Sequence, residues 1–428
     1  MKRDTFLGHP KGLFLLFASE LWERFSFYAL RAVLVLYLTA LTIDGGLGWS
    51  KADALRLYGI YTGLIYITPL IGGALADNTL GQRKAVLFGA VLMAAGQFVL
   101  SAFPSGLYAG LLLLICGNGL FKPNISTMVG DLYDKNDTRR DSAFTIFYMG
   151  INIGSFFAGI AAGFILMQWS FQTAFFVAGL GMLIALGLQL CLAKRYLGNI
   201  GTLPAARKVR NESKAPLSRT EIAHLKTLMT LGVFSVVFWA GFEQAGGLLT
   251  LFAEEQTNRT IAGLTVPTAF FQSLNPLFII LLAPVFAWIW AKAGDKAPSF
   301  AVKFVWALAF SALGFLFMIG AAWENRGEAQ ASMLWLVATY FFHTVGELCL
   351  SPTGLSMVAK LAPARYLSLM MGVWFCFAAA ANFTAGFVGA FLDDWGALPI
   401  FVALFGISLI AAFVLRLMSN RLERLAAK

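Results

Sequence analysis

The feature that most constrains this chain is a series of apolar runs that recurs along nearly all of its 428 residues. Each run has about 20 residues, enough for a helix to cross ~30 Å of hydrocarbon. Because 59% of the residues are hydrophobic and 13% are charged, a soluble fold could not bury this much apolar surface. The sequence therefore predicts an all-α membrane protein with twelve spans, centred on residues 13–41, 56–76, 85–103, 106–128, 143–165, 171–193, 227–252, 268–291, 300–321, 332–358, 367–391 and 398–417.

The basic residues that give the chain its net charge of +10 fall on alternate loops between the predicted spans. Segment 194–226 is strongly basic, with only Glu212 and Glu221 as acids, whereas the loops AEEQTNR, AWENRGEA and LDDWGA are acidic or neutral. The positive-inside rule then predicts that both termini and this segment are cytoplasmic, and no nucleic-acid partner is expected. The basic residues on the predicted cytoplasmic side are Arg83, Lys84, Lys194, Arg195, Arg207, Lys208, Arg210, Lys214, Arg219, Lys226, Lys292, Lys296, Lys360, Arg365, Arg421 and Arg424.

The twelve predicted spans divide into two sets of six. We expect an N-terminal bundle at 1–194, a polar cytoplasmic linker at 195–225 and a C-terminal bundle at 226–428. Two such bundles, with substrate bound near the midplane between them, are the usual plan of a secondary transporter. No G-x-x-x-x-G-K-[ST] loop occurs, so an ATP-driven pump is not expected, and neither is a soluble domain or a cleavable signal peptide.

The four cysteines, Cys116, Cys191, Cys349 and Cys376, all fall in predicted spans. Their positions lack metal-ligand spacing, so we interpret them as small packing residues. The sequence predicts no disulfide framework, no metal site and no cofactor.

The loop after the second span reads GGALADNTLGQRKAV, residues 72–86. Glycines permit close helix contact and a sharp turn, and an acid can meet basic groups or a helix N-terminus at the membrane edge. The loop resembles the signature loop of the major facilitator superfamily, whose positions are here Gly73, Asp77, Gly81, Arg83 and Lys84. An ordinary charged turn is the alternative interpretation.

Charged residues occur inside the spans, where lipid cannot accept them. In SELWERFSFYALRAV, positions 20, 23, 24, 27, 28 and 31 form one helical stripe that must face the bundle interior. The spans hold four acids (Glu20, Glu23, Glu243, Glu347) and three bases (Arg24, Arg31, Lys122), a balance of 3 − 4 = −1. An unbalanced buried carboxylate is relieved most simply by a proton, which points to proton coupling. A sodium site, an uncounted base or purely structural ion pairs remain as alternatives.

Several motifs resemble the proton-dependent oligopeptide transporter family. Glu20-x-x-Glu23-Arg24-Phe25 is similar to its E-x-x-E-R-F motif, and IFYMGINIGSF at 146–156 is similar to its F-Y-x-x-I-N-x-G-S signature. Further matches, in the same order as in the family, are GLFKPNIS, FWAGFEQ, FQSLNPLFII and GELCLSPTGLSMVAKLAP. The resemblance covers nearly the whole chain and implies a symporter that imports di- and tripeptides with protons by alternating access.

The resemblance also assigns roles to single positions. Arg24 and Lys122 match groups that bind the peptide carboxylate, and Glu347 matches the partner of its amine. The other positions that match substrate contacts are Tyr28, Tyr66, Asn152, Trp239, Asn275 and Trp374, and Ser351 is added because it lies one turn after Glu347. Each of these side chains could instead serve helix packing.

Proton coupling is assigned by the resemblance to the four carboxylates Glu20, Glu23, Glu243 and Glu347. Arg31 and Glu243 match the ion pair that closes the outer gate, and protonation of Glu243 would weaken it. His343, one turn before Glu347, either tunes that carboxylate or is a packed, hydrogen-bonded residue, and Pro352 marks a bend.

The chain departs from the family pattern at three places. Phe27 replaces the first tyrosine of a Tyr-Tyr pair, so one hydroxyl contact is in doubt. Gly59 stands where animal members carry a proton-binding histidine, so coupling must rest on carboxylates, as in bacterial members. The 195–225 linker has no room for the two extra helices of many bacterial members.

Other functions remain open at this stage. A drug/proton antiporter or a small-anion carrier of the same superfamily, a non-transporting peptide sensor and an intramembrane hydrolase using Ser351 and His343 are the alternatives. The last two residues are eight positions apart on one helix, about 12 Å in rise, too far for a nucleophile–base pair. We expect a non-enzymatic monomer in a bacterial inner membrane, with peptides, protons and lipid as its partners.

Overall fold

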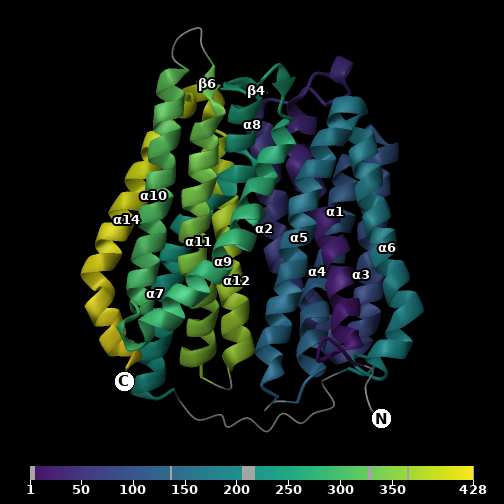
Figure 1. The fold of residues 1–428 in the computed structure, drawn as a ribbon, viewed down its shortest axis with the longest axis vertical. Helices are drawn as coiled ribbons and strands as arrows, with labels where there is room; N and C mark the ends of the chain where they lie inside the picture. The colour runs from purple at the N-terminus through teal and green to yellow at the C-terminus, as the bar shows by residue number, and fades with distance from the viewer. Residues whose placement is uncertain (1–4, 135–136, 205–216, 326–329, 364–365, 428) are drawn as a thin grey trace. The chain divides into compact units, whose positions relative to one another are not determined.

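The computed structural model describes residues 5–134, 137–204, 217–325, 330–363 and 366–427 (Figure 1). Five basic residues used for the topology prediction, Arg207, Lys208, Arg210, Lys214 and Arg365, lie outside these ranges, as does Glu212. The chain forms two compact units. One comprises Met1–Gly48 and Leu64–Arg210, and the other comprises Trp49–Gly63 and Asn211–Lys428.

The first unit is built from helices and one short hairpin. Its elements are β1 (Thr5–Phe6), β2 (His9–Pro10), α1 (Lys11–Thr39), α3 (Gln82–Ala102), α4 (Leu107–Asp131), α5 (Arg139–Gln168) and α6 (Phe171–Leu197). Helix α2 (Lys51–Leu75) is shared, because Lys51–Gly63 belongs to the second unit and Leu64–Leu75 to the first.

The second unit contains the remaining elements. The helices are α7 (Arg219–Phe242), α8 (Leu248–Glu255), α9 (Leu274–Ala293), α10 (Phe300–Glu324), α11 (Met333–Leu361), α12 (Leu367–Gly389), α13 (Leu392–Trp395) and α14 (Ala397–Ala426). The strands are β3 (Thr257–Asn258), β4 (Thr260–Ile261), β5 (Leu264–Thr265) and β6 (Ala331–Ser332). Each strand has two residues; β4 pairs antiparallel with β5, and β3 pairs parallel with β6.

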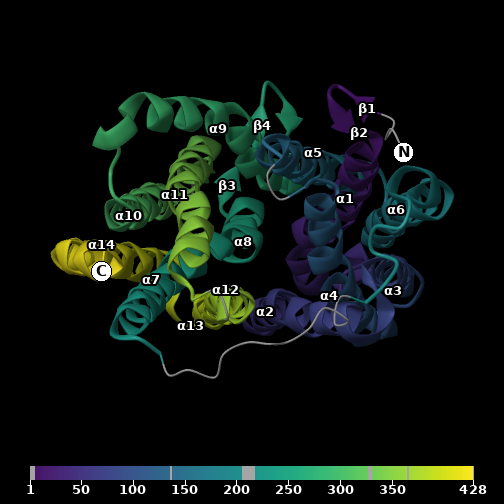
Figure 2. The same cartoon turned by 90° about the horizontal axis from the view of Figure 1, so that it is seen from below.

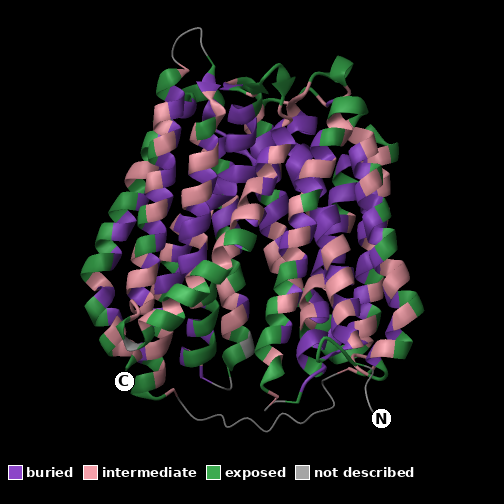
Figure 3. Cartoon of the chain, viewed as in Figure 1, coloured by how far each residue is buried: buried purple, intermediate pink, exposed green. Residues whose placement is uncertain are grey.

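Eleven helical segments among the described residues are long and apolar enough to cross a membrane. The further long helix is α1, which has 29 residues but carries the charged stripe. Large apolar side chains stay exposed on these helices; Figure 3 shows buried and exposed turns following one another along α14. Exposed apolar surface of this extent is compatible with a lipid environment.

Serine residues begin several of these helices. Ser170, Ser218 and Ser299 accept hydrogen bonds from the backbone N–H three residues later, at 3.3, 3.1 and 3.4 Å. At α7 the cap is reciprocal, because the Glu221 carboxylate accepts from the Ser218 N–H at 2.7 Å. Such side chains satisfy N–H groups that have no partner within the helix, and thereby fix where the span begins.

Within the first unit, α1 packs against α5 and α6, and α3 packs against α4 and α6 (Figure 2). Two buried glutamines add polar contacts to α1. Gln189 on α6 donates to Ser19 Oγ at 2.8 Å, and Gln97 on α3 donates to Ser26 Oγ at 3.2 Å. Interhelical hydrogen bonds of this kind hold membrane helices in register. They anchor the face of α1 on either side of Glu20, Glu23 and Arg24.

Within the second unit, α10 packs against α11 and α14, and α7 packs against α12 and α14. Phe238, Phe304 and Leu415 are part of its buried core. The predicted packing role of the cysteines holds for Cys349, which belongs to this core. It is wrong for Cys116, Cys191 and Cys376, which are exposed on their helices.

Two glycines allow the first part of α2 to approach α12 very closely. A Cβ placed on Gly59 would lie 2.7 Å from the Cα of Gly386 and 2.9 Å from the Asn382 carbonyl oxygen. These neighbours are backbone atoms, which cannot move aside as a side chain can. Small residues at such a crossing permit close backbone packing in membranes.

We expect Gly59→Ala to lower the thermal midpoint of the detergent-solubilised protein, with a loss of about 1–3 kcal/mol from overpacking. The matched control is Gly406→Ala in α14, where an added Cβ meets no heavy atom within 4 Å. That variant should leave the midpoint unchanged or raise it, because alanine favours the helix. Equal midpoints for the two variants would contradict the close crossing.

A short 3₁₀ turn, Glu243–Gly246, separates α7 from α8 inside the predicted span 227–252. The break leaves the Ala245 carbonyl outside the helical pattern, and three donors satisfy it. Thr250 Oγ1, Gln272 Nε2 and Tyr340 Oη donate to it at 2.9, 2.6 and 3.2 Å. This replacement is what makes a broken helix tolerable at membrane depth.

Candidate functional site

The charged stripe of α1 forms a compact cluster in the first unit. Glu20, Glu23 and Arg24 are 1%, 0% and 3% exposed. Arg24 donates from both Nε and Nη2 to the Glu23 carboxylate, with an Nη2–Oε1 distance of 2.5 Å, and its Nε lies 3.4 Å from Glu20 Oε1. One guanidinium therefore serves two carboxylates. A fork of this kind is the strong form of an ion pair.

Asn118 on α4 completes this cluster. Its Nδ2 donates to Glu23 Oε1 at 3.1 Å. Two acceptor atoms, Glu20 Oε2 and Asn118 Oδ1, are buried without a hydrogen-bond partner among the described residues. A buried carboxylate oxygen without a donor destabilises the charged form of the group, so the cluster is suited to a proton on Glu20.

Lys122 lies one turn after Asn118, on the same face of α4. Its Nζ is 5.1 Å from the centre of the Tyr66 ring, which comes from the part of α2 that belongs to the first unit. The residues predicted to bind a carboxylate, Arg24 and Lys122, are thus placed on α1 and α4 of one unit.

Aromatic rings lie beside the cations of α1. The Arg24 guanidinium is 4.9 Å from the Phe27 ring centre, and that of Arg31 is 5.7 Å from the Tyr28 ring centre. Phe27, which replaces a tyrosine of the family pattern, therefore still offers a π face to Arg24. Asn152 is buried on α5 and donates to the Tyr148 carbonyl of its own helix at 3.0 Å.

In the second unit, Asn275 joins α9 to α11. Its Nδ2 donates to Glu347 Oε2 at 2.8 Å and to Thr344 Oγ1 at 3.0 Å. Asn275 and Glu347, both predicted as substrate contacts, are therefore direct hydrogen-bond partners although they are 72 positions apart in the chain. The amide holds one oxygen of the Glu347 carboxylate in place. Preorganised carboxylates of this type suit the binding of an ammonium group.

His343, one turn before Glu347, is buried in an aromatic environment. Its ring lies edge-on to Phe315 with centroids 4.9 Å apart, and its Nε2 has no hydrogen-bond partner among the described residues. This environment favours a packing role for His343 over tuning of the Glu347 carboxylate. Ser351 is half-buried on α11, and the helix continues through Pro352.

The two tryptophans predicted as pocket walls both pack on the core of the second unit. Trp239 lies edge-on to Phe242 at 5.1 Å, and Trp374 lies edge-on to Phe304 at 6.3 Å. Both remain half-buried. Glu243 is 4% exposed and stands where α7 ends, at the start of the 3₁₀ turn.

The predicted loop motif contains a π-helical turn, Ala76–Leu80, which includes Asp77. Gly81 has φ of 76°, a left-handed conformation that favours glycine. Arg83 donates from Nη1 to the Gly198 carbonyl at 2.8 Å, which ties the start of α3 to the end of α6. Asp77 and Lys84 are exposed.

Two residues of the clusters were not predicted from the sequence. Asn118 and Thr344 lie four residues before Lys122 and three before Glu347, so helical spacing from a charged residue was the available signal. In the described ranges, no group of three or more His, Cys, Asp and Glu side chains is placed to hold a metal ion.

A model of the POT family matches residues 83–200 and 194–398. Peptide transporter YePEPT of Yersinia enterocolitica is 38% identical over 490 residues, covering 98% of this chain and 96% of that protein. The di-/tripeptide transporter of Lactococcus lactis subsp. cremoris is 35% identical over 434 residues, with 87% of each chain covered.

A solved structure is similar over the same extent. The crystal structure of a mutant of peptide transporter POT, in complex with alafosfalin, has a TM-score of 0.93 and 35% identity, covering 99% of this chain and 97% of that one. The predicted fold class, an all-α membrane protein with the major facilitator fold, is confirmed. The resemblance drawn from separate motifs is confirmed over the full chain: the protein belongs to the POT family.

Proposed function

We propose that the protein is a symporter that imports di- and tripeptides together with protons, by alternating access. Membership of the POT family, with relatives that are named as peptide and di-/tripeptide transporters, supports this function. The observation that carries it is the buried Glu20–Glu23–Arg24 cluster, in which two carboxylates share one forked guanidinium.

The proton part of the proposal rests on charge balance inside that cluster. Taking two carboxylates out of water costs several kcal/mol for each charge unless a partner or a proton compensates. Arg24 compensates Glu23 directly, whereas one oxygen of Glu20 has no donor among the described residues. We assign proton coupling to Glu20 and Glu23, together with Glu243 and Glu347, and assign the gate to Arg31 and Glu243.

The peptide part rests on complementary charge in the two units. Arg24 and Lys122 would pair with the peptide carboxylate, and Glu347, held by Asn275, would pair with its amine. Neither a cation nor an acid alone would recognise a zwitterion, which separates this proposal from a drug antiporter or an anion carrier. Contacts to the rest of the peptide are assigned to Tyr28, Tyr66, Asn152, Trp239, Ser351 and Trp374.

We also propose a bacterial inner-membrane location with both termini cytoplasmic, and a functional division at 1–194, 195–225 and 226–428. Arg195 and Arg219 within the 195–225 segment, and Lys194 beside it, support this orientation. A monomer suffices for the mechanism, because one chain supplies all of the assigned groups. No chemical step on the substrate is assigned to any residue.

Uptake of labelled dialanine into proteoliposomes tests the function. With an imposed inward proton gradient we expect uphill accumulation that collapses when a protonophore is added. At one pH unit, each coupled proton supplies about 1.4 kcal/mol, enough for roughly tenfold accumulation.

Protein-free liposomes provide the background. Accumulation that survives the protonophore would contradict proton coupling. If folded protein took up no dialanine, the proposal of peptide transport would be contradicted. A small-anion carrier and a non-transporting peptide sensor would then be the functions to test.

A further inference from the structure

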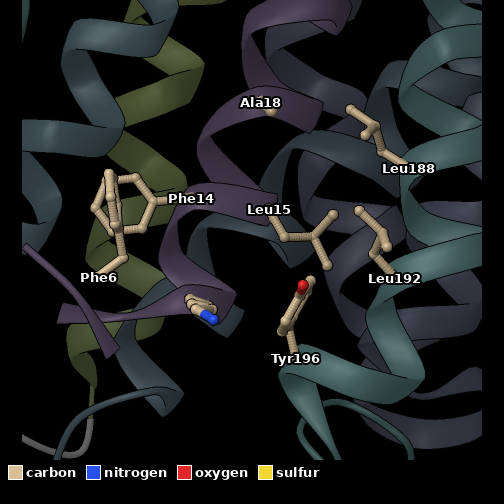
Figure 4. Close-up of a pocket in the computed structure, with 8 residues that line it drawn as sticks. Phe6, Phe14, Leu15, Ala18, Leu188, Leu192 and Tyr196 are labelled. Atoms are coloured by element: carbon tan, nitrogen blue, oxygen red, sulfur yellow. The ribbon is translucent and has the colours of Figure 1, made fainter. Parts of the chain in front are cut away.

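A separate cavity lies at one end of α1 and α6, away from the charged cluster. It has a volume of about 290 Å³, and its apolar lining is Phe6, Phe14, Leu15, Ala18, Leu188 and Leu192. Figure 4 shows Phe14, Leu15 and Ala18 arriving from one helix and Leu188, Leu192 and Tyr196 from another. A single water occupies about 30 Å³, so the cavity could hold a much larger apolar group.

The β1–β2 hairpin forms one wall of this cavity and is fixed in place. Phe6 packs edge-on against Phe14 with ring centroids 5.0 Å apart, and His9 hydrogen-bonds to Tyr133 Oη at 2.8 Å. Arg139 donates to the Gly8 carbonyl at 2.8 Å, while its pairing with Asp137 lowers the pKa of that acid to about 2. These contacts tie the hairpin wall to Phe14 of α1, to Tyr133 and to Arg139 of α5.

Cations lie in the lining of the cavity and next to it. Lys11, the first residue of α1, is one of the lining residues, and Tyr196 lines the cavity beside Arg195, whose guanidinium is 5.4 Å from the Tyr196 ring centre. Lys194 is in the same last turn of α6. None of the lining residues, all within the described ranges, is acidic. An apolar interior with a basic rim matches an amphiphile that has an anionic head.

We propose that this cavity binds an anionic phospholipid, with part of an acyl chain between α1 and α6 and the phosphate at Lys11 and Arg195. The apolar lining and the position beside α6, a helix apolar enough to cross a membrane, favour a lipid over a soluble ligand. Juxtamembrane cations attract anionic head groups, and the apolar interior accepts the chain.

The site is one turn away from the charged stripe. Leu15, which lines the cavity, accepts a hydrogen bond from Ser19 Oγ through its carbonyl at 2.9 Å, and the same Oγ accepts from Gln189 at 2.8 Å. Bound lipid would thus stabilise the α1–α6 contact next to Glu20. This inference concerns lipid binding and stability, and it stands or fails independently of peptide transport.

Native mass spectrometry of the purified full chain tests the proposal directly. The delipidated protein is incubated with equal amounts of phosphatidylglycerol and phosphatidylcholine that carry identical chains. We expect one tightly retained phosphatidylglycerol per chain, and a higher thermal midpoint in its presence. Lys11→Gln should reduce its retention roughly five-fold, equivalent to about 1 kcal/mol for one cation.

Cavity-filling variants separate the site from general attraction to a basic surface. Ala18→Phe and Leu188→Phe should each abolish the tightly retained lipid. The matched control is Leu190→Phe, also on α6, whose side chain is 62% exposed and outside the lining. Thermal midpoints measured without lipid identify a variant that fails to fold. If one of Ala18→Phe and Leu188→Phe fails, lipid retention by the other tests the site.

Three results would overturn the proposal. The first is equal retention of both phospholipids by the wild type. The second is unchanged retention of phosphatidylglycerol in folded Ala18→Phe and Leu188→Phe. The third is displacement of the phospholipid by oleate at equal concentration, which would assign the cavity to a free fatty acid.

Discussion

Replacing Glu23 with glutamine is expected to abolish proton-driven accumulation of peptide. In the wild type, the Glu23 carboxylate accepts hydrogen bonds from both Nε and Nη2 of Arg24. Glutamine has nearly the same size, but it cannot take up a proton and does not give Arg24 a buried anionic partner. Accumulation should fall from roughly tenfold per proton at one pH unit to the equilibrium value of one. Exchange of labelled for unlabelled dialanine across equal concentrations, which requires no net proton movement, should persist.

The control for Glu23→Gln is Asp44→Asn, which removes one carboxylate from an exposed position in the first unit. It should behave as the wild type in both assays. Removing one partner of a buried ion pair costs about 3–5 kcal/mol, so the persistence of exchange also reports that the variant is folded. Wild-type accumulation by Glu23→Gln would eliminate this residue from the coupling mechanism.

Glu347→Gln is expected to have the second large effect, on the recognition of the peptide amine. Glutamine can still accept the hydrogen bond from Asn275, so the local geometry should survive while the negative charge is lost. A hydrogen bond between charged groups contributes about 1.5–3 kcal/mol, so the KM for dialanine should rise roughly 10- to 150-fold. N-acetylated dialanine, which has no ammonium group, should show little change.

The matched control is Glu324→Gln in the same unit. Glu324 is an exposed carboxylate that accepts a hydrogen bond from Trp335 Nε1 at 2.5 Å, and glutamine can accept it equally. Its KM for dialanine should remain that of the wild type. If Glu347→Gln weakened both substrates to the same extent, Glu347 could not be the partner of the amine, and a structural role would replace that assignment.

Hydrophobic pattern alone was sufficient to place the spans, because a run of about 20 apolar residues has few alternatives in a membrane. It could not locate the break after Phe242. Glu243, Gln244 and the Gly246–Gly247 pair interrupt the apolar run from Trp239 to Phe252, but they do not show where the helix ends. The 3₁₀ turn also depends on donors from Gln272 and Tyr340, which lie far along the chain. The two-residue strands were missed for a similar reason, since no alternating pattern fits in so short a segment.

The candidate site was only partly accessible from the sequence. Helical spacing placed Glu20, Glu23 and Arg24 on one stripe, and the structure brings them into direct contact. The partnership of Asn275 with Glu347 joins two helices, and no local pattern relates α9 to α11. Only the family resemblance pointed to both Asn275 and Glu347. Asn118 and Thr344 were not predicted, because neither matches a family position that was assigned a role.

The crossing of Gly59 and Gly386 restricts the paths by which this sequence could diverge. A histidine at position 59, as in animal members of the family, would place its Cβ against backbone atoms of α12. Substitution at Gly386 could not compensate, because that residue has no side chain left to remove. A side chain at position 59 would therefore require the axes of α2 and α12 to move apart. The proposed use of carboxylates rather than a histidine for proton chemistry fits a crossing at which neither glycine has room for a side chain.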